Sequence, residues 1–206
     1  MLLLNDNLPA KSQHEYLNII TEKSEALATI VDELLDLSRI EAGRIITLDR
    51  QQHTLDTVVQ PFINQYRDSC PTHQIVTDFN DLETNLYIDK NKLTQAIENI
   101  LSNAIKYSPK GGTITIKTHK TATNFIITVS DQGIGMTAAQ LERIFDKFYR
   151  VDSSNTAVGG LGIGLSIVKN IIESHHGTIQ VNSELGVGSS VDITLPLAKY
   201  HDHCEH

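Results

Sequence analysis

Apolar positions in the first part of the chain recur at alternating intervals of three and four residues. The repeat contains Leu17, Ile20, Leu27, Val31 and Leu34, while Ser24 and Ser38 keep its register. This spacing predicts a helix that packs lengthwise against other helices. Residues 2–9 are typical of the end of an earlier helix and a turn. We therefore expect residues 1–44 to hold the second helix of a helical hairpin whose first helix lies upstream.

The pattern changes after residue 44. Apolar residues between Leu55 and Tyr66 indicate a helix, with a kink expected at Pro61. Further helical spacing covers Lys92–Tyr107, Thr137–Phe148 and Gly164–His175. Alternation of apolar and polar residues predicts strands at Thr113–Thr118, Asn124–Ser130, Thr178–Asn182 and Val191–Leu195. Residues 45–199 are thus predicted to form an α+β fold, a two-layer sandwich of one mixed sheet packed on helices, followed by a tail at 200–206.

Charge and composition narrow the functional classes. The 206 residues carry a formal net charge of -8, which argues against nucleic acid or acidic lipid as the main partner. No apolar run reaches the roughly 18–20 residues that a membrane span needs. The two cysteines, Cys70 and Cys204, have no partner motif and fit a reducing compartment. These features predict a soluble, cytoplasmic portion, whether or not the parent protein has a membrane anchor.

The first motif with chemical potential lies on the predicted helix Lys92–Tyr107. Asn99, Asn103 and Lys106 follow at i, i+4 and i+7, so they form one polar stripe beside an apolar face. Amide oxygens are ligands for a hard cation, and an ammonium group attracts phosphate oxygens. The alternative is the solvated face of an amphipathic helix.

The second motif, Asp131-Gln132-Gly133-Ile134-Gly135, directly follows a predicted strand. An aspartate at a strand end can accept a hydrogen bond from an exocyclic amine such as that of adenine. The glycines allow the backbone to turn or to approach a flat ligand closely. The alternative is a plain turn with a capping aspartate before the next helix.

Two further motifs are rich in glycine. Gly159-Gly160-Leu161-Gly162-Ile163-Gly164-Leu165 opens a helix, where exposed N–H groups are suited to bind phosphate. No strand immediately precedes it, so a Rossmann unit is not expected. Gly186-Val187-Gly188-Ser189-Ser190 joins the last two strands. Between the second and third motifs, residues 145–150 look like a lid whose Lys147 or Arg150 reaches phosphates on closing; the alternative is a helix end with a basic residue.

Taken together and in this order, the four motifs resemble the histidine-kinase-type ATPases, which are grouped with the gyrase, Hsp90 and MutL ATP-binding folds. The resemblance covers Asp89–Leu197 closely and Leu17–Arg44 more loosely. Residues 36–43, Asp-Leu-Ser-Arg-Ile-Glu-Ala-Gly, resemble the junction after the second dimerisation helix of sensor kinases. The run Phe-Asp-Lys-Phe-Tyr-Arg-Val-Asp at 145–152 favours sensor kinases over the other ATPases of this fold.

The resemblance implies ATP and Mg²⁺ as ligands and a role for each motif. Asn103 would ligate Mg²⁺ with support from Asn99, while Lys106 would contact phosphate and Tyr107 the ribose side. Asp131 would bind the adenine amino group, in a wall shaped by Gly133 and Gly135. The lid hinge and phosphate amides would come from Gly160, Gly162 and Gly164 with the neighbouring Leu161 and Leu165. Gly188 and Ser189 would complete the adenine pocket, and Glu98 would assist the incoming histidine.

The resemblance further implies a protein-histidine kinase that passes the γ-phosphoryl group to a histidine and then to the receiver domain of a response regulator. Such kinases act as homodimers through the N-terminal helical region. The acceptor histidine is normally followed by an acidic residue and an Arg-Thr-Pro element, and no such segment occurs here. His14-Glu15 lacks this element and falls on the predicted second helix. We therefore expect the phosphoacceptor to be absent, so that this chain alone does not autophosphorylate.

Two alternatives remain open from the sequence. The first is a binding module in which ATP occupancy controls docking to a partner without phosphoryl transfer. The second is a stand-alone ATPase or serine-directed kinase of the same fold, which the helical residues 17–38 disfavour.

Overall fold

The computed structural model describes residues 47–69, 72–151 and 161–197, together with 13, 16–21, 24, 27–28, 30–31, 34–35 and 38. The described residues between 13 and 38 are helical, as predicted. The predictions for His14, Cys70, Gly160, Cys204 and the tail lie outside the described residues. None of the described helices combines the length and the hydropathy that a membrane span needs.

Five strands form the main sheet in the order β2-β4-β5-β7-β6. Their bounds are His73–Phe79 for β2, Gly112–Lys120 for β4, Asn124–Ser130 for β5, Thr178–Glu184 for β6 and Gly188–Pro196 for β7. β2 runs parallel to β4, and the other pairs are antiparallel. The predicted mixed sheet is therefore confirmed. Its register places Val129 opposite Val191 and Val191 opposite Val181, so three valines form one row across β5, β7 and β6.

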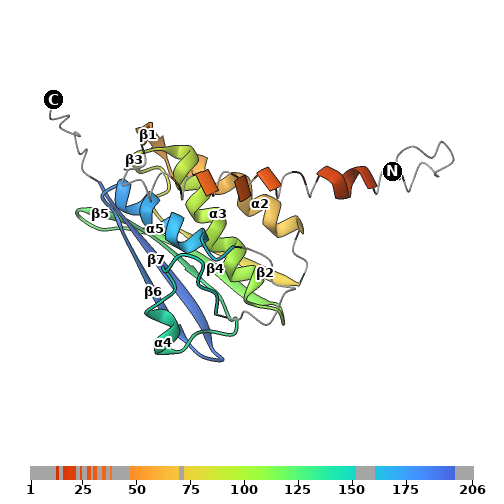
Figure 1. Cartoon of the computed structure of the whole chain (residues 1–206). Coiled ribbons are helices and arrows are strands. Elements are labelled where there is room, and N and C mark those ends of the chain that lie inside the picture. The colour runs from red at the N-terminus through yellow and green to blue at the C-terminus, as the bar shows by residue number, and fades with distance from the viewer. Residues whose placement is uncertain are drawn as a thin grey trace.

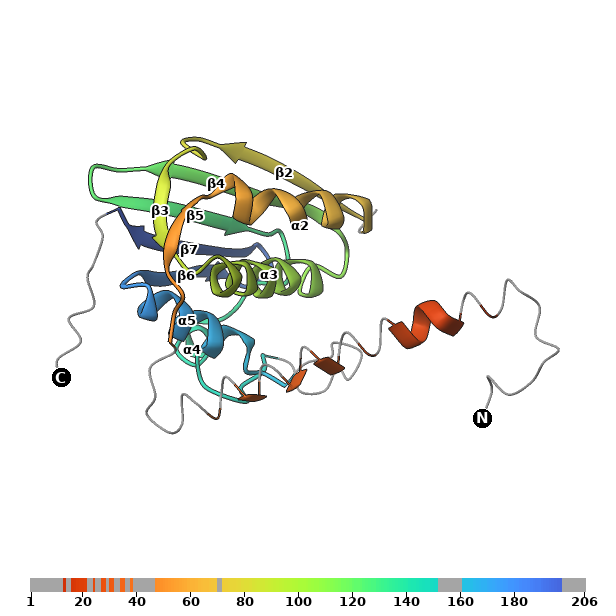
Figure 2. The same cartoon turned by 90° about the horizontal axis from the view of Figure 1, so that it is seen from above.

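The helices α2 (Asp56–Ser69), α3 (Lys90–Lys106) and α5 (Gly164–Ser174) form a second layer over one face of this sheet (Figures 1 and 2). Buried isoleucines and leucines of α3 and α5 meet the inward-facing side chains of β4 and β5, including the fully buried Phe125. α2 continues through Pro61 to Ser69. The two-layer α+β prediction is thus confirmed.

Three short or edge strands were not predicted. β1 (Gln51–Thr54) pairs antiparallel with β3 (Asn85–Ile88) in a separate two-stranded sheet, and β2 is an edge strand of the main sheet. Each has several exposed positions, and β1 and β3 have four residues each, so alternation is too short to stand out from loop sequence. β3 leads directly into α3 through Asp89, which caps that helix.

The helix predicted at Thr137–Phe148 is wrong beyond its first turn. α4 covers only Ala138–Leu141, where Thr137 and Gln140 form a capping box. The backbone then continues in tight turns, with i to i+3 hydrogen bonds from Arg143 to Gln140 and from Asp146 to Arg143. Phe148 has a φ of 64°, which an α-helix excludes. The apolar residues of this segment therefore belong to a series of turns that leads to residues 149–151.

Candidate functional site

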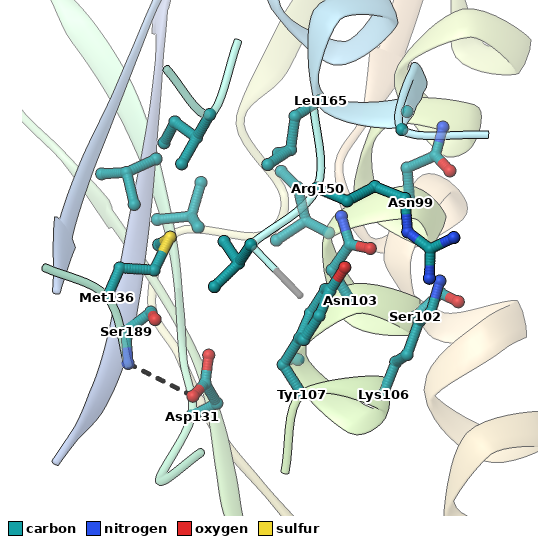
Figure 3. Close-up of a pocket in the computed structure, with 18 of the residues that line it drawn as sticks. Asn99, Ser102, Asn103, Lys106, Tyr107, Asp131, Met136, Arg150, Leu165 and Ser189 are labelled. Atoms are coloured by element: carbon teal, nitrogen blue, oxygen red, sulfur yellow. Dashed lines mark hydrogen bonds between the residues drawn. The ribbon is translucent and has the colours of Figure 1, made fainter. Parts of the chain in front are cut away.

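A cavity of about 550 Å³ lies between the sheet and the helices α3 and α5. The valine row of β5, β7 and β6 forms part of its apolar wall. Figure 3 shows Asp131, Ser189 and Met136 on the sheet side, with the polar residues of α3 facing them. A volume of this size is within the range of small-molecule sites.

The α3 wall supplies Asn99, Ser102, Asn103 and Lys106. The apolar face of α3 is buried through Leu93, Ala96, Ile97, Ile100, Leu101 and Ala104, of which Ile100 and Ala104 also line the cavity. Burial of these apolar residues fixes the rotation of the helix, and the amphipathic pattern then aims the polar stripe at the cavity. The Nζ atom of Lys106 lies 5.7 Å from the centroid of the Tyr107 ring, so the ammonium group is held beside that aromatic face.

The opposite wall contains the carboxylate of Asp131, just after β5. Its Oδ1 atom accepts hydrogen bonds from the N–H of Gly133 at 2.8 Å and the N–H of Ser189 at 3.2 Å. Burial raises the pKa of Asp131, and the two backbone donors oppose that rise. Both donors use Oδ1, so Oδ2 is left to meet a donor on a ligand.

Close backbone contacts require glycine in the turn after Asp131. Gly135 has a φ of 62°, and a Cβ atom there would lie 1.9 Å from the carbonyl oxygen of Glu184. Gly188 has a φ of 138°, and a Cβ atom there would lie 2.1 Å from the carbonyl oxygen of Asp131. These glycines let the turn and the β6–β7 hairpin lie directly against each other. The carboxylate of Asp131 is therefore positioned by backbone.

The third side of the cavity contains the start of α5. Gly162, Gly164 and Leu165 line it, together with Leu161 and Arg150. Ile163, the N-cap of α5, makes no side-chain capping hydrogen bond, so its side chain does not satisfy the N–H groups at the positive end of the helix. A Cβ atom at Gly164 would lie 3.3 Å from Oδ1 of Asn99, so α3 and α5 converge here.

Most of the predicted site residues line this cavity. They are Asn99, Asn103, Lys106, Tyr107, Asp131, Gly135, Arg150, Leu161, Gly162, Gly164, Leu165 and Ser189. Gly133 and Gly188 pack directly against Asp131 without lining the cavity themselves. Lys147 and Glu98 are exposed and do not line the cavity. Partial burial of its carboxyl nevertheless raises the pKa of Glu98.

Most of the apolar lining of the cavity was not predicted from the sequence. The missed residues are Ile30, Ile100, Ser102, Ala104, Val129, Ile134, Met136, Ile144, Tyr149, Val151, Val181 and Val191. The sequence could have indicated the three valines, because each alternates in step with the inward-facing apolar residues of its predicted strand. It indicated Ser102 more weakly, through its position one helical turn before Lys106. Ile30 belongs to the N-terminal helix, which was predicted to form a separate part of the chain.

The donor set on α3 fits a hard cation. Asn99 and Asn103 offer amide oxygens, and among the described residues no group of three or more His, Cys, Asp or Glu side chains is arranged to hold a metal. Mg²⁺ commonly uses one or two protein oxygens and completes its shell with phosphate oxygens and water. The site therefore suits a cation that arrives with a phosphorylated ligand.

Curated relatives resemble nearly the whole chain. The sensor histidine kinase WalK of Bacillus subtilis (strain 168) is 32% identical over 185 residues, which cover 88% of this chain and 30% of WalK. The sensor-like histidine kinase SenX3 of Mycolicibacterium smegmatis is 36% identical over 188 residues, covering 89% of this chain and 48% of SenX3. The chain thus spans less than half the length of either relative.

Solved structures show the same fold. Histidine kinase AdeS of Acinetobacter baumannii has a TM-score of 0.70 at 24% identity, covering 96% of this chain and 90% of AdeS. Full-length ShkA, solved in complex with AMPPNP, has a TM-score of 0.75 at 23% identity, covering 95% of this chain and 41% of ShkA. Residues 88–199 match the family described as histidine kinase-, DNA gyrase B-, and HSP90-like ATPase. The chain therefore belongs to the histidine kinase-, DNA gyrase B- and HSP90-like ATPase family.

Proposed function

We propose that this chain is the ATP-binding catalytic part of a sensor histidine kinase. The observation that carries the proposal is the arrangement of one cavity, with the carboxylate of Asp131 on one wall and Asn99, Asn103 and Lys106 on the other. A nucleotide has a base with an amino donor at one end and phosphates at the other. The cavity offers the complementary groups in the same order.

The adenine base would lie against the valine row and Met136, with its amino group donating to Oδ2 of Asp131. Ser189 would help close that end, and Tyr107 would line the ribose. The phosphates would then point toward Lys106, Arg150 and the start of α5. An apolar wall combined with one charged acceptor suits a flat base with a single exocyclic amine.

Asn103 would hold Mg²⁺, with Asn99 as the second oxygen donor. When bound, the metal would neutralise phosphate charge, which the net charge of -8 makes necessary. The chain's own contribution is position: Lys106 attracts the phosphate oxygens, and the N–H groups at the start of α5 orient them.

The transfer step would join the γ-phosphorus of ATP to a ring nitrogen of a histidine on the dimerisation helix and release ADP. Positioning of the nucleophile in line with the phosphate dominates such reactions. Glu98, on the exposed edge of α3, would assist the incoming histidine. Residues 1–44 would belong to the dimerisation region of a homodimer and 45–199 to the catalytic domain, and the phosphohistidine would be passed to a response-regulator receiver domain.

A phosphotransfer assay tests the proposal. The full 206-residue chain is incubated with Mg²⁺, γ-labelled ATP and a separate dimerisation hairpin from a related sensor kinase that carries the acceptor histidine. We expect acid-labile label on the hairpin, lost in Asp131→Asn and retained in Asp192→Asn, a matched change outside the cavity. Label released as phosphate, with none on the hairpin, supports a stand-alone ATPase. Acid-stable label on a serine supports a serine kinase, and tight binding without turnover supports a nucleotide-gated binding module.

A further inference from the structure

A series of hydrogen bonds joins the segment before β1 to the start of α3 and the end of α5. The N–H of Asp49 donates to Oδ2 of Asp89 at 2.9 Å, and the N–H of Lys92 donates to Oδ1 of Asp89 at 3.0 Å. The N–H of Asp89 itself donates to Nε2 of His175 at 3.0 Å. Asp89 and His175 are 8% and 4% exposed, so the bond between them is buried, whereas the bonds from Asp49 and Lys92 are partly buried.

A second contact runs beside the first. The guanidinium group of Arg50 donates to the carbonyl oxygen of Ser174, the last residue of α5. From Gln51 onward the same segment becomes β1, which pairs with the β3 strand that leads into Asp89. We call Asp49, Arg50, Asp89 and His175 the clasp. It holds the segment that follows the N-terminal helix against the ends of both site helices.

The clasp requires a neutral imidazole in one tautomer. Nδ1 of His175 lies 2.7 Å from the carbonyl oxygen of Ile171, which can only accept, so Nδ1 carries the proton. Nε2 is then unprotonated and accepts from the N–H of Asp89. A second proton on the ring would place a donor against a donor. Burial lowers the pKa of His175, which favours this neutral form.

The clasp lies at the start of α3 and the end of α5, whereas the cavity is lined by the second half of α3 and the start of α5. Along α3, Asn99 follows Asp89 by ten residues, which is about 15 Å at 1.5 Å per residue. Along α5, Gly164 precedes His175 by eleven residues, or about 16.5 Å. The cavity ends also meet, since Gly164 lies against the side chain of Asn99. A shift at the clasp therefore changes the relative position of the two phosphate-side walls.

We propose that the clasp couples the position of residues 47–50 to the nucleotide site, and that His175 is a positioning residue for Asn99 and for the start of α5. The inference rests on the proposed function, because it takes the cavity as the nucleotide site. By linkage, a nucleotide that draws α3 and α5 together must also tighten the clasp. The connection links residues 47–50 to the phosphate end of the cavity.

Two substitutions of His175 separate the role of Nε2 from general packing. In His175→Gln, Oε1 takes the position of Nε2 and accepts from the N–H of Asp89. In His175→Asn, Nδ2 takes the position of Nδ1 and donates to Ile171, while no acceptor faces Asp89. Both variants remove the ring, so a purely structural role of the ring affects them alike.

Amide hydrogen exchange of the full chain, measured by NMR with and without a non-hydrolysable ATP analogue and Mg²⁺, tests the coupling. In wild type, we expect the analogue to slow exchange of the Asp49 and Asp89 amides by about fivefold or more. His175→Gln is expected to keep this protection, and His175→Asn to lose it while still binding the analogue. ¹⁵N shifts of His175 are expected to report the Nδ1-protonated tautomer.

The outcomes distinguish the two proposals. Changes at cavity amides such as Gly133 and Ser189, without change at Asp49 and Asp89, overturn the clasp and leave the nucleotide site standing. Equal protection in His175→Gln and His175→Asn also overturns it. No change at any amide means that no nucleotide binds, and the proposed function fails together with the clasp. If His175→Asn does not fold, Arg50→Gln is measured instead. This substitution removes the bond from the half-buried Arg50 to Ser174, so the analogue is expected no longer to slow exchange of the Asp49 and Asp89 amides.

Discussion

Asp131 and Ser189 are joined by two hydrogen bonds although 58 positions separate them. The N–H of Ser189 donates to the carboxylate Oδ1 of Asp131 at 3.2 Å, and the N–H of Asp131 donates to the carbonyl oxygen of Ser189 at 2.8 Å. The carboxylate is thereby fixed by the backbone of β7. Its orientation does not depend on another flexible side chain, which suits recognition of a rigid base.

The first prediction concerns the charge of Asp131. Asp131→Asn keeps the size of the side chain but weakens the acceptor, so nucleotide affinity is expected to fall about 10- to 150-fold, the equivalent of roughly 1.5–3 kcal/mol for a hydrogen bond to a charged group. Titration calorimetry with a non-hydrolysable ATP analogue measures the change. Asp192→Asn is the control, because Asp192 lies on β7, accepts from Thr128 and does not line the cavity. Equal effects of the two substitutions would contradict the assignment.

The second prediction concerns the metal. Asn103→Ala removes an amide oxygen from the α3 wall, so the gain in analogue affinity on adding Mg²⁺ is expected to shrink markedly. The same titrations, run with Mg²⁺ and with a chelator, measure this gain. Asn91→Ala on the exposed first turn of α3 is the matched control and is expected to keep the full Mg²⁺ effect. A full effect in Asn103→Ala would place the metal elsewhere.

The third prediction compares two glycines with positive φ. Gly135→Ala and Gly186→Ala both strain the backbone, at roughly 1–2 kcal/mol each. Only Gly135 also faces a carbonyl oxygen, whereas nothing lies within 4 Å of a Cβ atom at Gly186. Overpacking adds to the cost, so Gly135→Ala is expected to lower the free energy of unfolding by about 3 kcal/mol or more. Urea unfolding measures both variants, and similar losses would refute the close contact.

The fourth prediction concerns the pH dependence of stability. The folded pKa of His175 lies below its ordinary value of about 6.5, because burial and the charges of Arg50 and His176 outweigh the carboxylate of Asp89 and the carbonyl of Ile171. The unfolded chain therefore binds the proton more readily. The stabilising contribution of the neutral ring is present above about pH 6.5 and is lost as the pH falls, by at most ~1.4 kcal/mol per pH unit.

His175→Gln is expected to flatten this part of the profile, measured by urea unfolding between neutral and mildly acidic pH. His119→Gln, at an exposed position on β4, is the control and is expected to follow the wild-type slope. A wild-type slope in His175→Gln would show that other groups dominate this range.

The sequence predicted those parts of the site that lie within one element. Asn99, Asn103 and Lys106 share a helix face, so their spacing is enough to bring them together. Asp131 stands at a strand end next to glycines, which marks it without any knowledge of its partners. The bond from Ser189 to Asp131 joins strands that are distant in sequence, and no local pattern specifies that pairing.

Contacts between distant segments and irregular turns were not predicted from the sequence. The clasp joins Asp49, Asp89 and His175, whose separations of 40 and 86 residues hide the contact. The residues after α4 have helical spacing but form i to i+3 turns, so apolar periodicity gave a helix that is too long. Lys147 was predicted from charge near the lid; it is exposed next to the turn at Phe148, and its contact with phosphate stays a prediction.

The most direct test of the proposed nucleotide site is a crystal structure of the full chain with a non-hydrolysable ATP analogue and Mg²⁺. We expect the adenine amino nitrogen about 3 Å from Oδ2 of Asp131. We also expect Mg²⁺ about 2.1 Å from the amide oxygen of Asn103, with the phosphates toward Lys106 and the start of α5. An analogue bound with its phosphates beside Asp131, or bound outside this cavity, would rule out the proposed site.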